Sequence, residues 1–401
     1  MATAHPRAAK AAWQTCLEAG LSSREILARL VSMPTVSRTS NAAIAGHAAK
    51  ILLDAGFDVA VVEAGEGRQN LFASIGPLDR KGIVLSGHTD VVPVDGQSWT
   101  SDPFRLVERN GRLYGRGAAD MKGFVACVLN AARSVDPRAL KWPLHVALSC
   151  DEEIGCVGVR PLLQQLHRQG VAAALCIVGE PTSMRVATSH KGKLSARAVC
   201  LGREAHSALA PQGLNAIHLA SDLVLALRTC QSELATQTGL EPLFDLPYST
   251  VHAGLISGGV ALNIVPARCV IDFEIRNLPT VAAETILDRI REEAHQILAR
   301  CGDAAADIII EVTGGYPGLH TPAGDLGDIV SLLGGNDRIG LSFGTEAGLF
   351  RDTLGCPTVV CGPGSMDQGH KPDEFVTLDQ LAQCDAMLQR LLQRLSIDRP
   401  L

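Results

Sequence analysis

The stretch KGIVLSGHTD, residues 81–90, joins an apolar run rich in β-branched residues to a polar cluster that begins at His88. A short apolar run of this kind predicts a buried strand. Two further predicted strands, 145–149 and 172–178, also end just before acidic side chains. Because ligands of open α/β sheets bind beyond the carboxyl ends of the strands, we expect these polar clusters to meet at one edge of a sheet.

Helical segments alternate with these strands over the first half of the chain. Apolar residues recur at helical spacing in the segments 22–31, 42–55, 121–134 and 159–169. Strands that alternate with helices predict an α/β sheet with helices on both faces. The same pattern returns near residue 315, with a strand at 358–361 and a final helix at 378–395.

A different pattern interrupts the chain after about Lys191. Its order is strand, helix, strand, strand, helix, strand, which is typical of a compact split β-α-β unit. The predicted segments are 194–201, 215–231, 250–256, 269–276, 282–301 and 308–312. We therefore expect a catalytic domain in two parts, 1–190 and 315–401, interrupted by an inserted lid, 191–314.

Composition and charge exclude several classes of protein. The chain has 401 residues, 46% of them hydrophobic, and a net charge of −6. No stretch concentrates Lys and Arg, so neither nucleic acid nor an anionic membrane is an expected partner. The apolar runs fall short of a membrane span, and residues 1–30 lack the features of a signal peptide. The 12 cysteines form no Cys-x-x-Cys pair, which favours free thiols and a cytoplasmic location.

Five residues are candidate metal ligands. Three of them, His88, Glu153 and Glu180, follow predicted strands; Asp120 precedes a helix, and His370 lies beyond the strand that ends at Cys361. Imidazoles and carboxylates that converge on one rim suit zinc or cobalt. Taken singly, each residue could be an ordinary buried or turn-forming polar residue. That explanation does not account for polar clusters after every strand of one sheet.

Two further residues of the same clusters suggest roles in catalysis. Glu152 and Glu153 are adjacent, and in extended backbone neighbouring side chains point to opposite faces. One of them could therefore bind metal while the other faces the cavity as a general base. Asp90 lies two residues after His88 and could accept the second N–H of the imidazole. Cys150 and Cys156 flank the acidic cluster, and we interpret them as buried structural thiols.

Four motifs together resemble the M20 metallopeptidase family. They are SGHTDVVP (86–93), YGRGAADMKG (114–123), DEE (151–153) and GEPT (179–182). The resemblance covers about residues 26–395. It implies a zinc-exopeptidase-like catalytic domain with a mixed sheet flanked by helices, plus an inserted α+β, ferredoxin-like lid and dimerisation domain. It also implies two divalent metal ions and hydrolysis of an amide bond by a water molecule held between them.

The resemblance assigns a role to each candidate ligand. Asp120 would bridge both metals, His88 and Glu180 would complete one site, and Glu153 and His370 the other. Glu152 would be the general base, and Asp90 the partner of His88.

The resemblance also implies a homodimer formed through the inserted domain. His206 would then donate a hydrogen bond to the developing oxyanion, in its own or the neighbouring active site. The family usually has glycine before this histidine, and this chain has Ala205. Asn263 and Arg276 match positions that contact substrate, and the Arg276 guanidinium suits an α-carboxylate. Without the resemblance, His206 could be a surface histidine and Arg276 part of a salt bridge.

The run GTEAG, residues 344–348, bears on the substrate. It is similar to the acetylornithine deacetylases of the family, and Glu346 could pair with the side-chain ammonium of ornithine; alternatively, Glu346 is a helix N-terminal acid. The expected reaction is removal of the acetyl group from N2-acetyl-L-ornithine. Another N-acyl amino acid, such as succinyl-diaminopimelate, or a dipeptide is the near alternative. A non-catalytic amino-acid-binding protein and a thiol-dependent enzyme are more distant ones.

Overall fold

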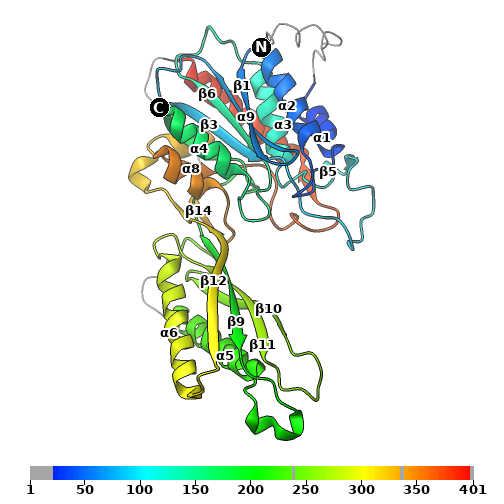
Figure 1. Cartoon of the computed structure of the whole chain (residues 1–401). Coiled ribbons are helices and arrows are strands. Elements are labelled where there is room, and N and C mark those ends of the chain that lie inside the picture. The colour runs from blue at the N-terminus through cyan, green and yellow to red at the C-terminus, as the bar shows by residue number, and fades with distance from the viewer. Residues whose placement is uncertain (1–20, 237–239, 335–337, 398–401) are drawn as a thin grey trace, which may run out of the picture.

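The computed structural model describes residues 21–236, 240–334 and 338–397. Residues 1–20, which carry most of the N-terminal segment expected to lack a signal peptide, lie outside these ranges. The chain builds a larger body around a nine-stranded sheet and a smaller body around a four-stranded sheet, shown at the top and bottom of Figure 1. These are called the large sheet and the second sheet below.

The large sheet is mixed, as expected. Its order is β1-β2-β6-β3-β7-β15-β8-β13, with β14 paired to β8. Strand β3 runs parallel to β6 and β7, and β15 runs parallel to β7, whereas β1 and β2 are antiparallel. The strands are β1 (Asp58–Gly65), β2 (Arg68–Ile75), β3 (Gly82–His88), β6 (Leu144–Ser149), β7 (Ala173–Val178), β8 (Val186–His190), β13 (Leu319–His320), β14 (Arg338–Leu341) and β15 (Thr358–Val360).

Helices cover both faces of the large sheet. Along β3, Ile83 and Leu85 pack with the helices of one face, while Val84 packs with those of the other, because successive side chains of a strand alternate. The first face carries α1 (Ser23–Val31), α2 (Ala42–Asp54), α3 (Lys122–Arg133), α7 (Ile329–Leu333) and α9 (Leu378–Leu395), and the second carries α4 (Val159–Gln169) and α8 (Ala347–Leu354). The body is therefore a three-layer α/β/α arrangement.

The second sheet has the element order expected for residues 191–314. It is antiparallel in the order β10-β11-β9-β12, and two helices pack against it. Alternate residues of β11, such as Ile271 and Phe273, are buried in a core of its own. The elements are β9 (Lys193–Leu201), α5 (Ala216–Leu234), β10 (Thr250–Gly258), β11 (Arg268–Arg276), α6 (Ala283–Cys301) and β12 (Asp307–Tyr316).

The remaining elements are short. A three-stranded sheet has the order β16-β5-β4, with β4 (Val107–Arg109), β5 (Arg112–Tyr114) and β16 (Phe375–Thr377), and the 3-10 segments are η2 (Ser207–Gln212) and η3 (Ala323–Asp325). Every cysteine in the described ranges is a free thiol. None of the helices in those ranges combines the length and apolar character that a membrane crossing requires.

Candidate active site

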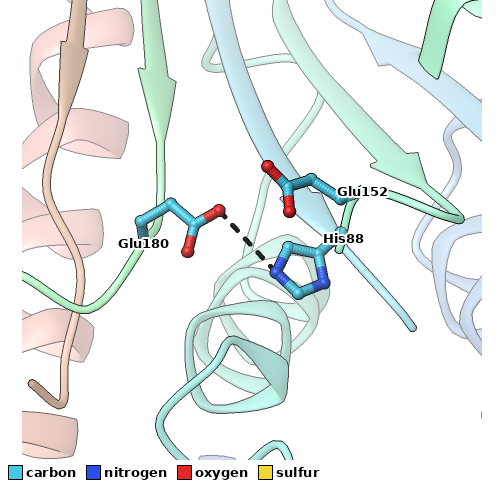
Figure 2. A group of neighbouring side chains, drawn as sticks. All are labelled: His88, Glu152 and Glu180. Carbon is cyan, nitrogen blue, oxygen red and sulfur yellow. Dashed lines mark ion pairs between the residues drawn. The ribbon is translucent and has the colours of Figure 1, made fainter. Parts of the chain in front are cut away.

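Four parallel strands of the large sheet end at one edge, and several of the candidate ligands follow them. Strands β6, β3, β7 and β15 are neighbours in that order and run the same way, so their carboxyl ends lie together. His88 is the last residue of β3, and Glu180 follows β7. Figure 2 shows the side chains of His88, Glu152 and Glu180 pointing toward one another.

Asp120 lies between two imidazoles. Its Oδ1 is 3.0 Å from Nε2 of His88, and its Oδ2 is 3.1 Å from Nε2 of His370. The nitrogen of His88 is also 3.7 Å from Oε1 of Glu180, while that of His370 is 2.9 Å from Oε2 of Glu153. The structure therefore brings together all five sequence-predicted ligands, with one imidazole and one further carboxylate on each side of Asp120.

The electrostatics of this cluster fit a site for cations. Burial, above other causes, raises the pKa of Glu152 to about 8 and that of Glu153 to about 7. Hydrogen bonds to Asp120 and then to Glu153 raise the pKa of His370 to about 10. Burial alone would lower the pKa of His88, but Asp120 and the other carboxylates around it raise the pKa overall. The carboxylates thus stabilise positive charge at this point.

The donor set also fits divalent metal ions. Ligand atoms of His88, Glu152 and Glu180 lie within 4.8 Å of one another, as do those of His88, Asp120 and Glu153. Oε1 of Glu153 is buried and has no hydrogen-bond partner among the described residues. A buried carboxylate oxygen without a donor is costly, and a cation would satisfy it. Neutral imidazoles and carboxylates are the ligands that zinc and cobalt accept.

The two glutamates after β6 are presented by a turn, which corrects the expectation of extended backbone. Asp151 has a φ of 51°, and the carbonyl of Glu152 accepts hydrogen bonds from the N–H groups of Gly155 and Cys156 at 2.9 and 2.7 Å. Because the chain turns here, the carboxylates of Glu152 and Glu153 line the same cavity and do not face opposite ways. The expected separation of a ligand from a base therefore does not follow from strand geometry.

Asp90 differs from its expected arrangement. Nδ1 of His88 is 3.0 Å from the backbone carbonyl oxygen of Asp90, whereas the nearest carboxylate oxygen is 3.6 Å away. The carbonyl, rather than the carboxylate, is thus the closer acceptor for the imidazole N–H. The Asp90 carboxylate instead accepts from the backbone N–H groups of Glu152 and Glu153, at 3.1 and 3.3 Å. It therefore fixes the turn that carries both glutamates.

A cavity of about 140 Å³ lies over the cluster. Five of the candidate residues, four carboxylates and one imidazole, line one wall: Asp120, Glu152, Glu153, Glu180 and His370. The opposite wall comes from the second sheet, where Lys193 begins β9, Arg276 ends β11 and Tyr316 ends β12. Arg276 donates to Oε1 of Glu274 at 3.0 Å and to the Tyr316 hydroxyl at 2.9 Å, so its guanidinium is held in place at this wall.

Comparison with known proteins identifies the family. Residues 84–394 match the family described as peptidase family M20/M25/M40. This chain belongs to that family. It is 33% identical over 380 residues to an acetylornithine deacetylase of Proteus mirabilis (strain HI4320). The matched region covers 92% of this chain and 95% of the relative. As an M20 protein with such relatives, it is a hydrolase of amide bonds.

Solved structures show the same M20 fold. The aminopeptidase PepT of Bacillus cereus has a TM-score of 0.73 at 20% identity, over 93% of this chain and 99% of the other. The YXEP protein of Bacillus subtilis, described as a dinuclear metal binding peptidase of the M20 family, has a TM-score of 0.69 at 14% identity, over 92% and 96% of the two chains. At such identities these likenesses concern the fold alone.

Two predicted residues of the M20 chain, one catalytic and one substrate-binding, lie away from this cavity. His206 and Asn263 are exposed, and the N–H of Ser207 donates to the carbonyl of Asn263 at 3.0 Å. His206 follows the end of β9 opposite to Lys193 and directly precedes η2, which lies in the green segment at the bottom of Figure 1. The nine residues of β9 separate its two ends by roughly 26 Å, at about 3.3 Å per residue. In this arrangement His206 does not reach the cavity of its own chain.

Glu346 is also absent from the cavity wall. It is fully buried as the N-cap residue of α8, and its two oxygens accept from the hydroxyls of Ser86 and Ser149 at 2.6 and 2.8 Å. The expectation that it pairs with a substrate ammonium is therefore at odds with its placement, because both oxygens are engaged inside the protein. Its position at a helix N-terminus agrees with the alternative interpretation.

Sequence reasoning missed the residue that holds Asp120. The buried carboxylate of Glu374 accepts from the N–H groups of Ala119 and Asp120 at 2.9 and 3.0 Å, and it pairs with Arg116 at 2.7 Å. Glu374 follows His370 closely in sequence, and Arg116 precedes Asp120, so both residues lie near predicted ligands in the sequence. Their pairing was not predicted, because it joins segments 258 residues apart.

Proposed function

We propose that this M20 hydrolase removes the acetyl group from N2-acetyl-L-ornithine, a reaction of arginine biosynthesis. The observation that carries the hydrolytic part is the position of Asp120: each of its two oxygens lies beside an imidazole, and each imidazole also lies near a second carboxylate. Similarity to an acetylornithine deacetylase over 92% of the chain supports the substrate.

We infer that Asp120, His88, Glu180, Glu153 and His370 hold two divalent metal ions, zinc or cobalt. When bound, such ions polarise a carbonyl and lower the pKa of a water molecule. The remaining steps belong to side chains. Glu152 lines the cavity beside the ligands, where it takes the proton of the attacking water and returns it to the departing amino nitrogen. Arg276 binds the α-carboxylate of the substrate.

A second candidate substrate is another N-acyl amino acid. The burial of Glu346 favours this alternative, because it removes the sequence-based partner for the ornithine ammonium. The cavity over the ligands is small, which suits an acyl group, and it shares Gly155, Lys193 and Tyr316 with a groove of about 1070 Å³. That groove offers room for side chains other than that of ornithine.

We propose that residues 191–314 form an inserted domain between the catalytic segments 1–190 and 315–401, and that two copies of the chain pair through it. The separate core of the second sheet supports the division. Its edge strand β10 and the following loop expose apolar side chains, with Leu255 at 69%, Val260 at 82% and Leu262 at 101%. Such a patch suits burial against a second copy. The free thiols support a reducing, cytoplasmic location.

The test is release of the acyl group by purified protein, first stripped of metal and then supplied with zinc or cobalt. N2-acetylornithine, N-acetylmethionine and succinyl-diaminopimelate are assayed side by side. We expect acetate from acetylornithine only after metal is restored. Faster hydrolysis of N-acetylmethionine or succinyl-diaminopimelate would change the proposed substrate but leave the proposed metal-dependent hydrolysis unchanged. Absence of hydrolysis of all three, in protein shown to contain metal, would contradict the proposed reaction.

A further inference from the structure

A neighbouring thiol holds the side chain of Glu152. Sγ of Cys156 donates a hydrogen bond to Oε1 of Glu152 at 3.1 Å, and the two residues are 0% and 8% exposed. The backbone N–H of Cys156 also donates to the carbonyl of Glu152 at 2.7 Å. Cys156 therefore bonds Glu152 through both backbone and side chain. Because both residues are almost fully buried, water competes little for this hydrogen bond to the carboxylate.

The backbone at this point is unusual. Cys156 has a φ of 55°, in the left-handed region that residues other than glycine seldom occupy, and it follows Gly155 at 105°. Glycine would adopt this conformation with less strain, yet the position carries a cysteine. Non-glycine residues in this region often accompany a functional constraint. Here the turn brings the thiol to the carboxylate, while the preceding Gly155 lines the cavity.

We propose that Cys156 is a positioning residue for Glu152. Its thiol fixes one carboxylate oxygen, which limits the rotation of the side chain and keeps the carboxylate directed into the cavity. A base that is held in its working geometry has less freedom to lose when the reaction occurs. The inference rests on the proposed role of Glu152 in catalysis. It requires neither ionisation nor chemical reactivity of the thiol.

The test compares substitutions at two buried cysteines. Cys156→Ala and Cys156→Gly remove the donor, and the glycine variant also suits the left-handed backbone, which protects the fold. Cys156→Ser keeps a donor. Cys176→Ala is the matched control, because Cys176 is also 0% exposed in the same hydrophobic core but lies within β7. For each variant we measure kcat, KM, bound metal and the midpoint of unfolding, with whichever N-acyl amino acid the wild type hydrolyses.

We expect Cys156→Ala and Cys156→Gly to lower kcat about tenfold, with KM and metal content within about twofold of wild type. Cys156→Ser is expected to recover kcat to within roughly threefold, since a hydroxyl can donate to the same oxygen. Cys176→Ala should lose stability by leaving a cavity but retain kcat. If Cys156→Ala and Cys156→Gly both keep wild-type kcat, or if serine fails to restore it, the positioning role is wrong.

A parallel Glu152→Gln variant separates this failure from failure of the proposed function. If Glu152→Gln keeps its activity, the role of Glu152 itself is wrong. If Glu152→Gln is inactive while Cys156→Ala and Cys156→Gly have wild-type kcat, the positioning role of Cys156 is wrong and the role of Glu152 stands.

Discussion

In the large-sheet body, most of the polar side chains at the site are buried and contact one another, whereas most of those predicted for the second sheet are exposed. His88, Asp120 and Glu180 are 1%, 4% and 4% exposed. His206 and Asn263 lie on the surface at the far end of the second sheet. Arg276 is intermediate, since it reaches the cavity wall. The predicted metal ligands and Glu152 thus come together within the large-sheet body, whereas of the residues predicted in the second sheet Arg276 lines the same cavity.

The largest effect is expected from removing the proposed base from the large-sheet body. We expect Glu152→Gln to lower kcat roughly a thousandfold, because the amide cannot take a proton from the attacking water. Metal content should remain that of the wild type, since the five proposed ligands are untouched. Steady-state kinetics and metal analysis check this. Activity close to wild type in a metal-loaded variant would show that the base lies elsewhere.

His206 tests what the second body contributes. We expect His206→Ala to lower kcat about a hundredfold, the usual effect of losing a donor to an oxyanion. Its fold should be unaffected, because the side chain is exposed. Unchanged kcat would identify His206 as an ordinary surface residue.

Mixing two inactive variants sharpens the same point. If His206 acts across a two-fold dimer, random reassociation of Glu152→Gln with His206→Ala restores about a quarter of wild-type activity, because half of the dimers are mixed and each has one intact site. If His206 acts within its own chain, the mixture stays inactive. Restored activity on mixing, measured after subunit exchange, therefore separates the two arrangements.

Arg276 gives the smallest expected effect, on binding. We expect Arg276→Ala to raise KM about tenfold with a smaller change in kcat, because a charged hydrogen bond to the α-carboxylate is lost. A substrate with an amidated carboxylate provides the control. For the amidated substrate, the KM of the wild type should be as high as the KM of Arg276→Ala for the substrate with a free carboxylate. Amidation should not raise the KM of Arg276→Ala any further. A full additional loss in the variant would place the carboxylate elsewhere.

Local patterns in the sequence predicted much of the fold. The apolar run before His88 and the similar runs before Glu152 and Glu180 correspond to β3, β6 and β7. The helix at α1 begins at a capping box formed by Ser22 and Glu25, whose bonds span only three residues. Strands β1 and β2 were not predicted, although they form an antiparallel pair at the edge of the large sheet. Strand β1 is largely exposed and shows no strict alternation.

The side chains that follow the parallel strands can be predicted from the sequence alone, because the hydrophobic pattern of a strand and the residue after it are local properties. From this the convergence of His88, Glu153 and Glu180 follows. Other contacts are set by the folded chain as a whole: Ser86 and Ser149 donate to Glu346, Glu374 accepts from the backbone of Asp120, and Cys156 donates to Glu152 from a left-handed turn. Most of these contacts join segments hundreds of residues apart, and the last depends on a backbone conformation that the residue type does not favour. No local pattern of apolar and polar residues encodes either.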